Sequence, residues 1–312
     1  MRKWLKITGT ALVSLTVLAG GYGIYVYQSV KATAEQIYEQ REPSSLPAFI
    51  SADPVLEEIH SADIDQRESF TVLVLGIDER PNDRGRSDAM IMLSVNPSKQ
   101  SILMFNIPRD TRTLIVGHGT EDKINHAYAF GGIQMSVRTV EELLHFPVNY
   151  YIKVNMEGFA NIIDALGGVD VDNTITFNYE GHHFKEGSLH LNGQEALAYS
   201  RMRYEDPRGD LGRNSRQRQI VKEVLKNALD VSTAFKLETL LKEVGTSVKT
   251  DIRFDEMKTF VTEYRQDMKK IEQVEIQGSG QNIGGIWYYN VADKERERIH
   301  ELLKEHMDRE GS

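Results

Sequence analysis

The sequence predicts one α/β domain preceded by a single transmembrane helix. Residues 7–30 contain no charge, and at about 1.5 Å per residue a helix of this length spans the roughly 30 Å hydrocarbon core of a bilayer. Phe70–Ile77, with the sequence FTVLVLGI, has the continuous apolar pattern of a strand that is buried on both faces. Beyond residue 66, β-rich and helix-periodic segments alternate without an evident break, which favours one α/β domain.

Composition limits the possible functions. The 312 residues include 37 Lys and Arg against 46 Asp and Glu, a net charge of −9. This acidic balance argues against bulk binding of nucleic acid, so any anion site must be local. The chain has no cysteine, which excludes disulfides, thiolate metal sites and a cysteine nucleophile.

The N-terminus predicts the orientation in a membrane. Residues 1–6 carry three positive side chains, and no charge follows until after residue 30. By the positive-inside rule, residues 1–6 stay in the cytoplasm and residues 7–30 form an uncleaved signal-anchor. A cleaved signal peptide, cut near Ala32-Thr33-Ala34, is the alternative, but its apolar region would exceed the usual span of about 7 to 15 residues. The rest of the chain is therefore expected on the extracytoplasmic face, as a spacer (31–65) and a domain (66–312).

Apolar periodicity and turn signals predict the elements of this domain. The expected strands are residues 70–77, 90–95, 102–107, 148–154, 169–177, 274–277 and 286–290. The expected helices are residues 123–130, 132–144, 156–166, 194–199, 220–229, 235–244, 254–267 and 294–307. The adjacent His182 and His183 are assigned to a turn rather than a metal site. The glycine-rich residues 278–285 lack the Lys-Ser/Thr of a P-loop and are interpreted as a flexible connection.

Residues 199–219, YSRMRYEDPRGDLGRNSRQRQ, concentrate arginines in an acidic protein. Arginine forks bind phosphate oxygens in pairs, so the cluster suggests a polyanion site. A solvated basic face is the simpler interpretation of such a cluster. Asp206 and Asp210 interrupt the arginines, and further acids and arginines elsewhere could converge on them.

Spacing divides this cluster into two sets. Arg201 and Arg203 are two residues apart and share a face if the backbone is extended. Arg213 and Gln217 are four apart, and their helical face continues into the apolar stripe of the following helix. They are expected at the inner end of that helix, whereas Arg216 and Arg218 are expected in solvent. A buried arginine needs an anion or an aspartate, so Asp210 could be a partner, a structural clamp or a general base.

Asp78 and Asp88 flank the polar loop DERPNDRGRSD between two apolar strands. Mg²⁺ is usually held by one or two carboxylates together with phosphate oxygens, so the pair could bind this ion. It is an equally good interpretation that these two aspartates have structural roles, one as a turn residue and the other as a helix or strand cap. Arg86 shares the face of Asp88 if the segment is extended, and Arg109 follows a strand that stops at Pro108. Lys123, in DKINHAYAFGG, is a further candidate for a phosphate or head-group contact, although a lone lysine is usually solvated.

Several stretches of the sequence resemble motifs of the LytR–CpsA–Psr enzymes of Gram-positive cell walls. The matching stretches are VLVLGIDER, GRSDAMIMLSVNP, FNIPRDTR, KINHAYAFGG, VNMEGFANIIDALGGVDV, LNGQEALAYSRMRY and DLGRNSRQRQIV. They follow the order of the family over roughly residues 70–225. Separate motifs in a fixed order are more specific than any one of them, and the N-terminal anchor also fits.

The resemblance implies a mixed β-sheet flanked by helices, with an apolar tunnel for a polyprenyl chain. It also implies a phosphotransferase that moves a glycopolymer from polyprenyl pyrophosphate to peptidoglycan. By motif, Asp78 and Asp88 would bind Mg²⁺, with Mn²⁺ as an alternative. The pyrophosphate oxygens would be held by Arg86, Arg109, Arg201, Arg203, Arg213 and Gln217. Arg86, Arg109 and Asp210 are expected to be catalytic, and either Asp88 or Asp210 would accept the hydroxyl proton.

Three other functions compete with this one. A hydrolase would use the same residues but pass the phosphoryl group to water. A membrane-tethered regulator would bind nucleic acid, which the acidic balance and the outward topology oppose. A binding module would hold the lipid-linked polymer without chemistry. By analogy alone, the polymer is expected to be wall teichoic acid, handled at the cell membrane of a Gram-positive bacterium.

Overall fold

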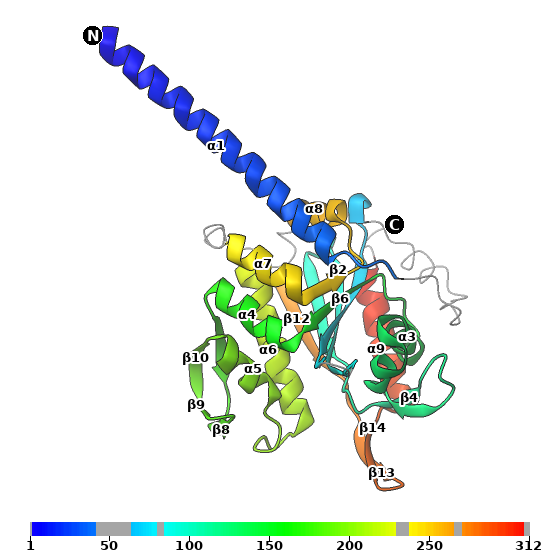
Figure 1. Cartoon of the computed structure of the whole chain (residues 1–312). Coiled ribbons are helices and arrows are strands. Elements are labelled where there is room, and N and C mark those ends of the chain that lie inside the picture. Colours follow the sequence, from blue (N-terminus) through cyan, green and yellow to red (C-terminus); the bar gives the residue numbers. More distant parts are fainter. Residues whose placement is uncertain (1, 42–63, 80–83, 229–236, 265–269, 309–312) are drawn as a thin grey trace.

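A mixed six-stranded sheet forms the centre of the domain (Figure 1). The computed structural model describes residues 2–41, 64–79, 84–228, 237–264 and 270–308. The strand order is β11 (Val248–Thr250), β6 (Tyr150–Asn155), β1 (Phe70–Ile77), β2 (Ser87–Asn96), β3 (Ser101–Asn106) and β12 (Lys270–Glu275). The β1–β6 and β3–β12 pairs are parallel, and the other neighbours are antiparallel. The expected α/β domain with a mixed central sheet and flanking helices is confirmed.

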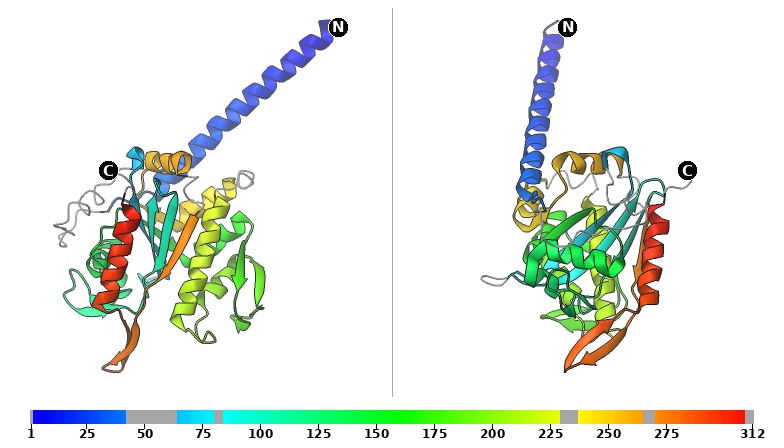
Figure 2. Two further views of the ribbon diagram at one scale, coloured as in Figure 1. Left: turned by 180° about the vertical axis from the view of Figure 1, so that it is seen from behind. Right: turned by 90° about the vertical axis from the view of Figure 1, so that its right-hand side faces the viewer.

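Helices cover both faces of this sheet. Leu73, Leu75 and Ile77 of β1 belong to a core shared with α3 (His126–Leu144) and α9 (Asp293–Met307). Phe70 and Val72 point to the opposite core, which includes side chains of α6 (Asp210–Ala228) and α8 (Phe254–Glu263). Alternate side chains of a strand point to opposite faces, so a strand with a helix layer on each side needs the continuous apolar run that the sequence shows. Figure 2 shows α9 and α6 on opposite sides of the sheet.

A second, smaller unit packs beside α6. It contains α4 (Met156–Leu166), α5 (Gly193–Arg201) and two short sheets, β7–β10 and β8–β9. The strands are β7 (Val169–Asn173), β8 (Phe177–Tyr179), β9 (His182–Phe184) and β10 (Gly187–Leu191). Phe177, Phe184 and Tyr199 form its aromatic centre. Asn192 caps α5 with a capping box, which fixes where the helix starts and therefore where Arg201 lies at its end.

The N-terminal helix α1 (Arg2–Ile37) ends on the domain. Ala34 and Ile37 are buried, and the Arg41 Nε lies 2.6 Å from Asp251 Oδ2. A backbone bridge joins Tyr38 to Thr250 of β11. The first residues of the expected spacer are therefore packed against the sheet, while residues 42–63 lie outside the described residues. Within the described part of the chain, no helix combines the length and the apolarity that a membrane crossing requires.

Several local expectations were wrong. The helix expected at residues 123–130 begins only at His126, because Glu121–Lys123 forms β5 and pairs with β4 (Arg112–Leu114). The expected strand 169–177 is divided between β7 and β8. His182 and His183 lie in β9 rather than in a turn. The glycine-rich residues 278–285 contain β13 (Ser279–Ile283), which pairs with β14 (Ile286–Asn290). The remaining helix, α7 (Leu237–Ser247), packs against α1 and α4.

Candidate active site

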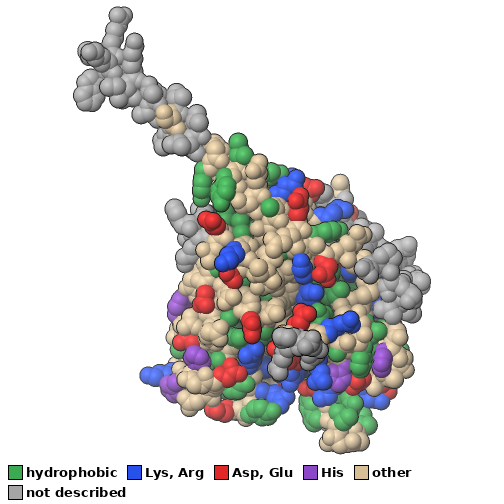
Figure 3. All heavy atoms as spheres, in the orientation of Figure 1, with side chains coloured by type: hydrophobic (Ala, Val, Ile, Leu, Met, Phe, Trp, Pro, Cys, Tyr) green, Lys and Arg blue, Asp and Glu red, His purple; other side chains and the backbone are tan. Residues whose placement is uncertain are grey.

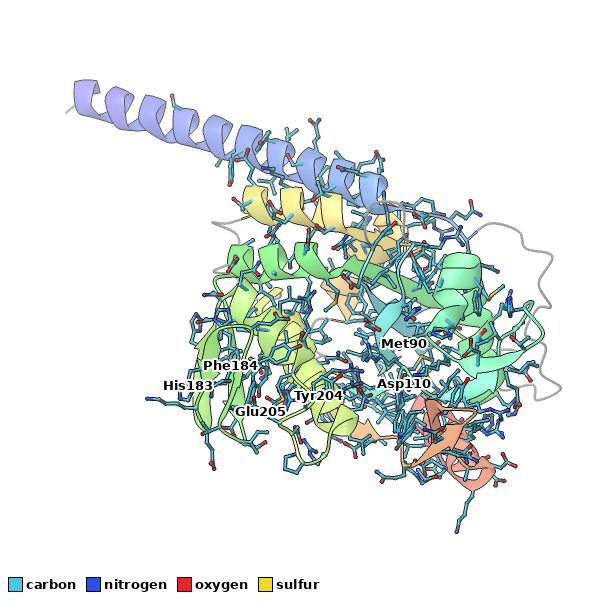
Figure 4. The ribbon with its side chains drawn as sticks, turned by 60° about the horizontal axis from the view of Figure 1, so that its bottom comes forward. Met90, Asp110, His183, Phe184, Tyr204 and Glu205 are labelled. Carbon is cyan, nitrogen blue, oxygen red and sulfur yellow. The ribbon has the colours of Figure 1, made fainter. Side chains whose placement is uncertain are left out.

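A polar cavity of about 340 Å³ opens between the ends of β1 and β2 and the α5–α6 region. Its lining residues are Asp78, Asp88, Arg109, Met156, Tyr179, Glu180, Ser200, Arg201, Arg203, Tyr204, Arg213 and Gln217. The sequence singled out nine residues as ligands of phosphate or metal, and seven of them line this cavity. Asp210, predicted to be catalytic, adjoins it through Arg213. Arg86 and Lys123 do not line it. Figure 4 labels Tyr204 and Asp110, which come from opposite sides of this region.

Asp78 and Asp88 reach the cavity from neighbouring strands. Asp78 directly follows β1, and Asp88 is the second residue of β2. The β1–β2 register shifts between Gly76 and Ile77, at the end where both carboxylates reach the cavity. The described residues contain no cluster of three or more carboxylate or histidine ligands. Two carboxylates on one cavity still fit Mg²⁺, because this ion commonly takes its other ligands from phosphate oxygens and water.

Arg109 is held by Asp88. Its Nη1 donates to Asp88 Oδ1 over 2.7 Å, and Asn125 Nδ2 contacts the same oxygen at 3.4 Å. Burial alone would lower the pKa of Arg109, but Asp88, with smaller contributions from Asp110 and Asp210, outweighs burial and the pKa is raised. Asp110 pairs with Lys123 at 2.7 Å and lies 3.7 Å from the Nε of Arg109. Lys123 is therefore linked to Arg109 of the cavity through Asp110.

Arg213 is a buried cation with unused hydrogen-bond donors. Its side chain is 6% exposed, and its Nη2 lies 2.7 Å from Asp210 Oδ1, although this contact is not aligned as a hydrogen bond. Its Nε and Nη2 have no hydrogen-bond partner within the described residues. Burial lowers the pKa of Arg213, Asp210 opposes this effect, and Arg109 adds to it. A buried guanidinium with spare donors is costly, so the site is suited to an incoming anion.

The other cavity side chains surround Arg213. Gln217, one turn further along α6, accepts a hydrogen bond from Asn106 at 3.1 Å. Arg201, at the end of α5, lies 3.8 Å from Glu180. Arg203 stacks on Tyr204, with its guanidinium 4.4 Å from the ring centroid. Arg86 is exposed and lies next to the cavity through its backbone, since its carbonyl accepts from the Asp78 amide at 3.3 Å.

Arg216 and Arg218 are not solvated, which corrects the sequence-based expectation. They are 4% and 5% exposed. Arg216 pairs with Asp206 at 2.6 Å and donates to the carbonyls of Tyr199 and Met202. Its neighbour along the helix, Arg218, donates to Asn106 Oδ1 at 3.0 Å. The physical reason is that α6 lies between the central sheet and the smaller unit, so more than its apolar stripe is covered.

Some cavity residues gave no signal in the sequence. Tyr179 and Glu180 reach the cavity because β8 and β9 form a hairpin, which requires tertiary structure to predict. Next to the cavity lies an apolar pocket of about 50 Å³. Its lining includes Val74, Gly76, Ala89, Phe159 and Ile220, and it shares Met156, Ser200 and Gln217 with the polar cavity. A charged cavity and an apolar pocket therefore adjoin, an arrangement that suits an amphiphilic ligand.

Comparison with known proteins agrees with this geometry. The sequence profile of the LytR–CpsA–Psr family (LytR_cpsA_psr) matches residues 22–305. A protein of Halalkalibacterium halodurans, named polyisoprenyl-teichoic acid–peptidoglycan teichoic acid transferase TagU, is 45% identical over 310 residues, 99% of both chains. The protein of the same name in Bacillus subtilis is 41% identical over 309 residues, 99% of this chain and 97% of that one.

Solved structures show the same fold. The crystal structure of B. subtilis TagU has a TM-score of 0.64 at 41% identity and covers 78% of this chain and 99% of that one. A structure described as TagT bound to LIIa-WTA has a TM-score of 0.67 at 27% identity, covering 79% and 93% of the two chains. Family motifs, fold and extended similarity all agree. The chain belongs to the LytR–CpsA–Psr family.

Proposed function

We propose that this protein is a phosphotransferase that moves wall teichoic acid from a polyprenyl-pyrophosphate carrier to a hydroxyl group of peptidoglycan. The observation that carries the proposal is Arg213, a buried cation with spare donors that faces a cavity containing Arg109, Arg201 and Arg203. The names of the similar TagU proteins and the TagT structure with bound LIIa-WTA support the choice of polymer and acceptor.

Binding of the pyrophosphate would use the arginines as fixed donors. Arg201, Arg203 and Arg213 approach the cavity from the α5–α6 side, and Arg109 approaches from the sheet side. Gln217 would add an amide donor beside Arg213. Phosphoryl transfer depends mainly on positioning and on stabilising negative charge, and arginines held by the fold supply both. The exposed Arg86 would contact the pyrophosphate only from the rim, and Lys123 would act indirectly by holding Asp110.

The reaction would replace the phosphoanhydride bond of the pyrophosphate with a phosphodiester bond to peptidoglycan. The oxygen of a peptidoglycan hydroxyl attacks the phosphorus next to the polymer, and the bond from this phosphorus to the bridging oxygen breaks. Polyprenyl phosphate leaves with the bridging oxygen and its electron pair. The hydroxyl proton passes to a carboxylate. Asp88 lines the cavity and Asp210 does not, so Asp88 is the better placed acceptor and Asp210 holds Arg213.

Asp78 and Asp88 would also hold a divalent ion, Mg²⁺ or Mn²⁺, in the presence of the substrate. Such an ion neutralises charge on the two phosphates and orients them. The apolar pocket beside the cavity would receive the isoprenyl units nearest to the phosphate, because its lining side chains are almost entirely apolar and exclude the charged part of the lipid.

The N-terminal segment would keep the enzyme at the membrane where its lipid substrate lies. Residues 7–30 carry no charge and follow a positively charged N-terminus, as expected for a single-pass anchor with residues 1–6 inside. The end of α1 is packed on the domain through Ala34 and Ile37. The anchor would therefore place the domain on the extracytoplasmic face at a short, fixed distance from the bilayer.

A reconstituted transfer reaction tests the proposal. The full chain in detergent is incubated with a polyprenyl-pyrophosphate-linked teichoic acid precursor, Mg²⁺ and polymer-free peptidoglycan. The expected products are a covalent polymer–peptidoglycan conjugate and polyprenyl phosphate in equal amounts. Free phosphorylated polymer without conjugate would show a hydrolase instead. Bound but unchanged lipid would show a binding module.

A further inference from the structure

The β13–β14 hairpin is an exposed apolar projection that the proposed phosphate chemistry does not use. Every residue of β13 is exposed, and Ile286 and Trp287 of β14 are 51% and 44% exposed. The hairpin extends from the end of the domain opposite to α1 (Figures 1 and 2). In Figure 3 the lowest projection of the molecule is green and tan, and charged side chains lie directly above it. Exposed apolar groups gathered on one projecting element commonly mark a binding surface.

Two glycines let aromatic rings lie flat on one face of the hairpin. A Cβ atom placed on Gly280 would be 2.9 Å from the indole nitrogen of Trp287. A Cβ atom placed on Gly278 would be 2.5 Å from the ring of Tyr289. The two rings are 6.4 Å apart and tilted by 39°, and Asn282 is paired with Trp287 across the strands. Tyr289 is only 6% exposed, so Trp287 is the exposed ring of this pair. An exposed ring beside an amide suits a sugar, whose C–H groups stack on rings and whose hydroxyls bond to amides.

The base of the hairpin is attached to the segment that carries Arg109. The backbone amide of Tyr289 donates to the carbonyl of Asp110 at 2.8 Å, and Thr111 forms a bridge with Tyr289. The Tyr289 hydroxyl donates to the carbonyl of Ile276 at 3.0 Å. Figure 4 places Asp110 beside this base. The hairpin is therefore attached to the residues that directly follow Arg109, a lining residue of the phosphate cavity.

The charge of the hairpin discriminates between possible occupants. Residues 276–292 contain no charged side chain, whereas the cavity is lined by four arginines and three acids. A phosphate-rich polymer would favour basic contacts, so it does not fit the hairpin. A membrane surface does not fit either, because the hairpin and α1 point to opposite ends of the molecule. An uncharged glycan strand matches both the aromatic face and the absence of charge.

We propose that the β13–β14 hairpin binds the sugar chain of the peptidoglycan acceptor and directs its hydroxyl toward the phosphate cavity. This inference rests on the proposed transferase function and identifies where its second substrate lies. Trp287 is the central contact, and Gly280 is required because any larger residue displaces the indole ring. Trp287 acts as a specificity-determining residue, not as a catalytic one.

Binding is tested separately from transfer. The full chain is sedimented with peptidoglycan sacculi stripped of teichoic acid. Trp287→Ala should weaken this binding roughly three- to tenfold, the effect expected from losing one aromatic contact, and Trp287→Phe should largely retain it. Val261→Ser, at a residue of α8 that is also 51% exposed, is the matched control and should bind normally. Gly280→Val, which keeps the tryptophan at position 287 but displaces its ring, should reproduce the defect.

A kinetic and a spectroscopic measurement complete the test. In the transfer reaction, Trp287→Ala should raise the KM for peptidoglycan by the same factor and leave the KM for the lipid donor unchanged. With Trp4→Phe, the chain retains Trp287 as its single tryptophan, and soluble glycan fragments should change its fluorescence. A thermal unfolding curve verifies that each variant remains folded.

The outcomes separate the two proposals. Loss of sacculus binding in Trp287→Ala without any transfer by the wild type would retain the hairpin proposal and overturn the transferase. Transfer and sacculus binding that are both unaffected by Trp287→Ala and Gly280→Val would overturn the hairpin proposal alone. It would also be overturned if these variants instead lost binding to phosphatidylglycerol vesicles, which would show a membrane contact. A change only in the oligomeric state would overturn it as well, by showing contact with a second copy.

Discussion

Helix α6 carries three equally buried arginines whose hydrogen-bond donors are satisfied to different degrees. Arg213 is 5% exposed, and Arg216 and Arg218 are 4% and 5% exposed. Arg216 is satisfied by a carboxylate and two carbonyls, and Arg218 by amide and acidic groups. Arg213 has one poorly aligned aspartate and unused donors. Burial by itself therefore does not identify a ligand site. The difference is whether the protein already satisfies the donors.

The largest expected effect is on stability, at the satisfied arginine. The side chains of Asp206 and Arg216 are 4% and 5% exposed, and their charged atoms are 2.6 Å apart. Asp206→Asn therefore leaves the Arg216 guanidinium buried beside a neutral amide. Breaking a buried pair from one side typically costs about 3–5 kcal/mol. Urea unfolding should therefore show a lower midpoint with an unchanged slope. A midpoint equal to that of the wild type would contradict the structural role of this pair.

The next effect is on activity, at the unsatisfied arginine. Arg213→Gln removes the charge that faces the cavity and should lower kcat/KM for the lipid donor by about 10²- to 10³-fold, as for other fixed charge-stabilising donors. The thermal midpoint should change little, because the lost cation had few partners of its own. Steady-state kinetics and thermal unfolding on one preparation measure both effects. An Arg213→Gln variant that is strongly destabilised but fully active would show that Arg213 is a structural residue rather than a ligand residue.

A third test extends the comparison to another satisfied polar group. His306 is buried far along the chain from the cavity residues, with Ser94 and Ser101 hydroxyls 2.7 and 2.9 Å from its two ring nitrogens. Burial, with a smaller contribution from Lys99, lowers its pKa to about 4. Between this pKa and its ordinary value of about 6.5, the unfolded chain binds the extra proton, so stability falls as pH falls through this window.

The low pKa of His306 should reduce the free energy of unfolding by about 2 kcal/mol between pH 7 and pH 5. His306→Gln should be less stable at neutral pH but should lose less stability on acidification. The comparison of wild type and variant by urea unfolding at both pH values removes the contribution of the carboxylates that both chains share. An identical pH dependence in the two chains would show that His306 is not held neutral in the fold.

The smallest effect is expected at Lys123, which pairs with Asp110 instead of lining the cavity. Lys123→Met should lower kcat/KM by less than about tenfold, because this partly exposed pair contributes about 1 kcal/mol or less to the position of Asp110. Arg109→Lys is the informative companion, since a lysine keeps the charge but loses the fork that contacts Asp88. A larger loss in Lys123→Met than in Arg109→Lys would indicate direct contact with the substrate.

The part of the fold that was predictable from the sequence is the part fixed by local patterns. The strand Phe70–Ile77 and the helix Met156–Leu166 were predicted with the bounds that the structure has. The strand is recognisable because both its faces are buried. The helix is recognisable because Asn155 caps its start and Gly167, with φ of 97°, ends it.

The rest depended on contacts that no local pattern encodes. Arg216 and Arg218 were placed in solvent because helical periodicity reveals one apolar face. Arg216 is covered by the smaller unit, and Arg218 by polar side chains of β3 and β12. The hairpin was missed for a different reason. Gly284 and Gly285, with φ of 60° and 85°, are a two-residue turn signal between Ile283 and Ile286, and the glycine-rich composition obscured it.

The candidate site was predictable as a set of residues but not as a geometry. The family motifs named the residues that now surround the cavity, and the structure separates those that line it from Arg86 and Lys123, which do not. The sequence also could not distinguish Asp88, on the cavity, from Asp210, beside Arg213. That distinction depends on which element each carboxylate leaves and on the direction of its side chain.

The central claim is that unsatisfied arginines around the cavity bind pyrophosphate, while satisfied arginines hold the fold. Calorimetric titration of the full chain with geranylgeranyl pyrophosphate and Mg²⁺ tests it most directly. The wild type should bind, Arg213→Gln should bind at least about 30-fold more weakly, and Arg218→Gln, where folded, should bind almost as the wild type does. Equal affinity of Arg213→Gln and the wild type would contradict the claim.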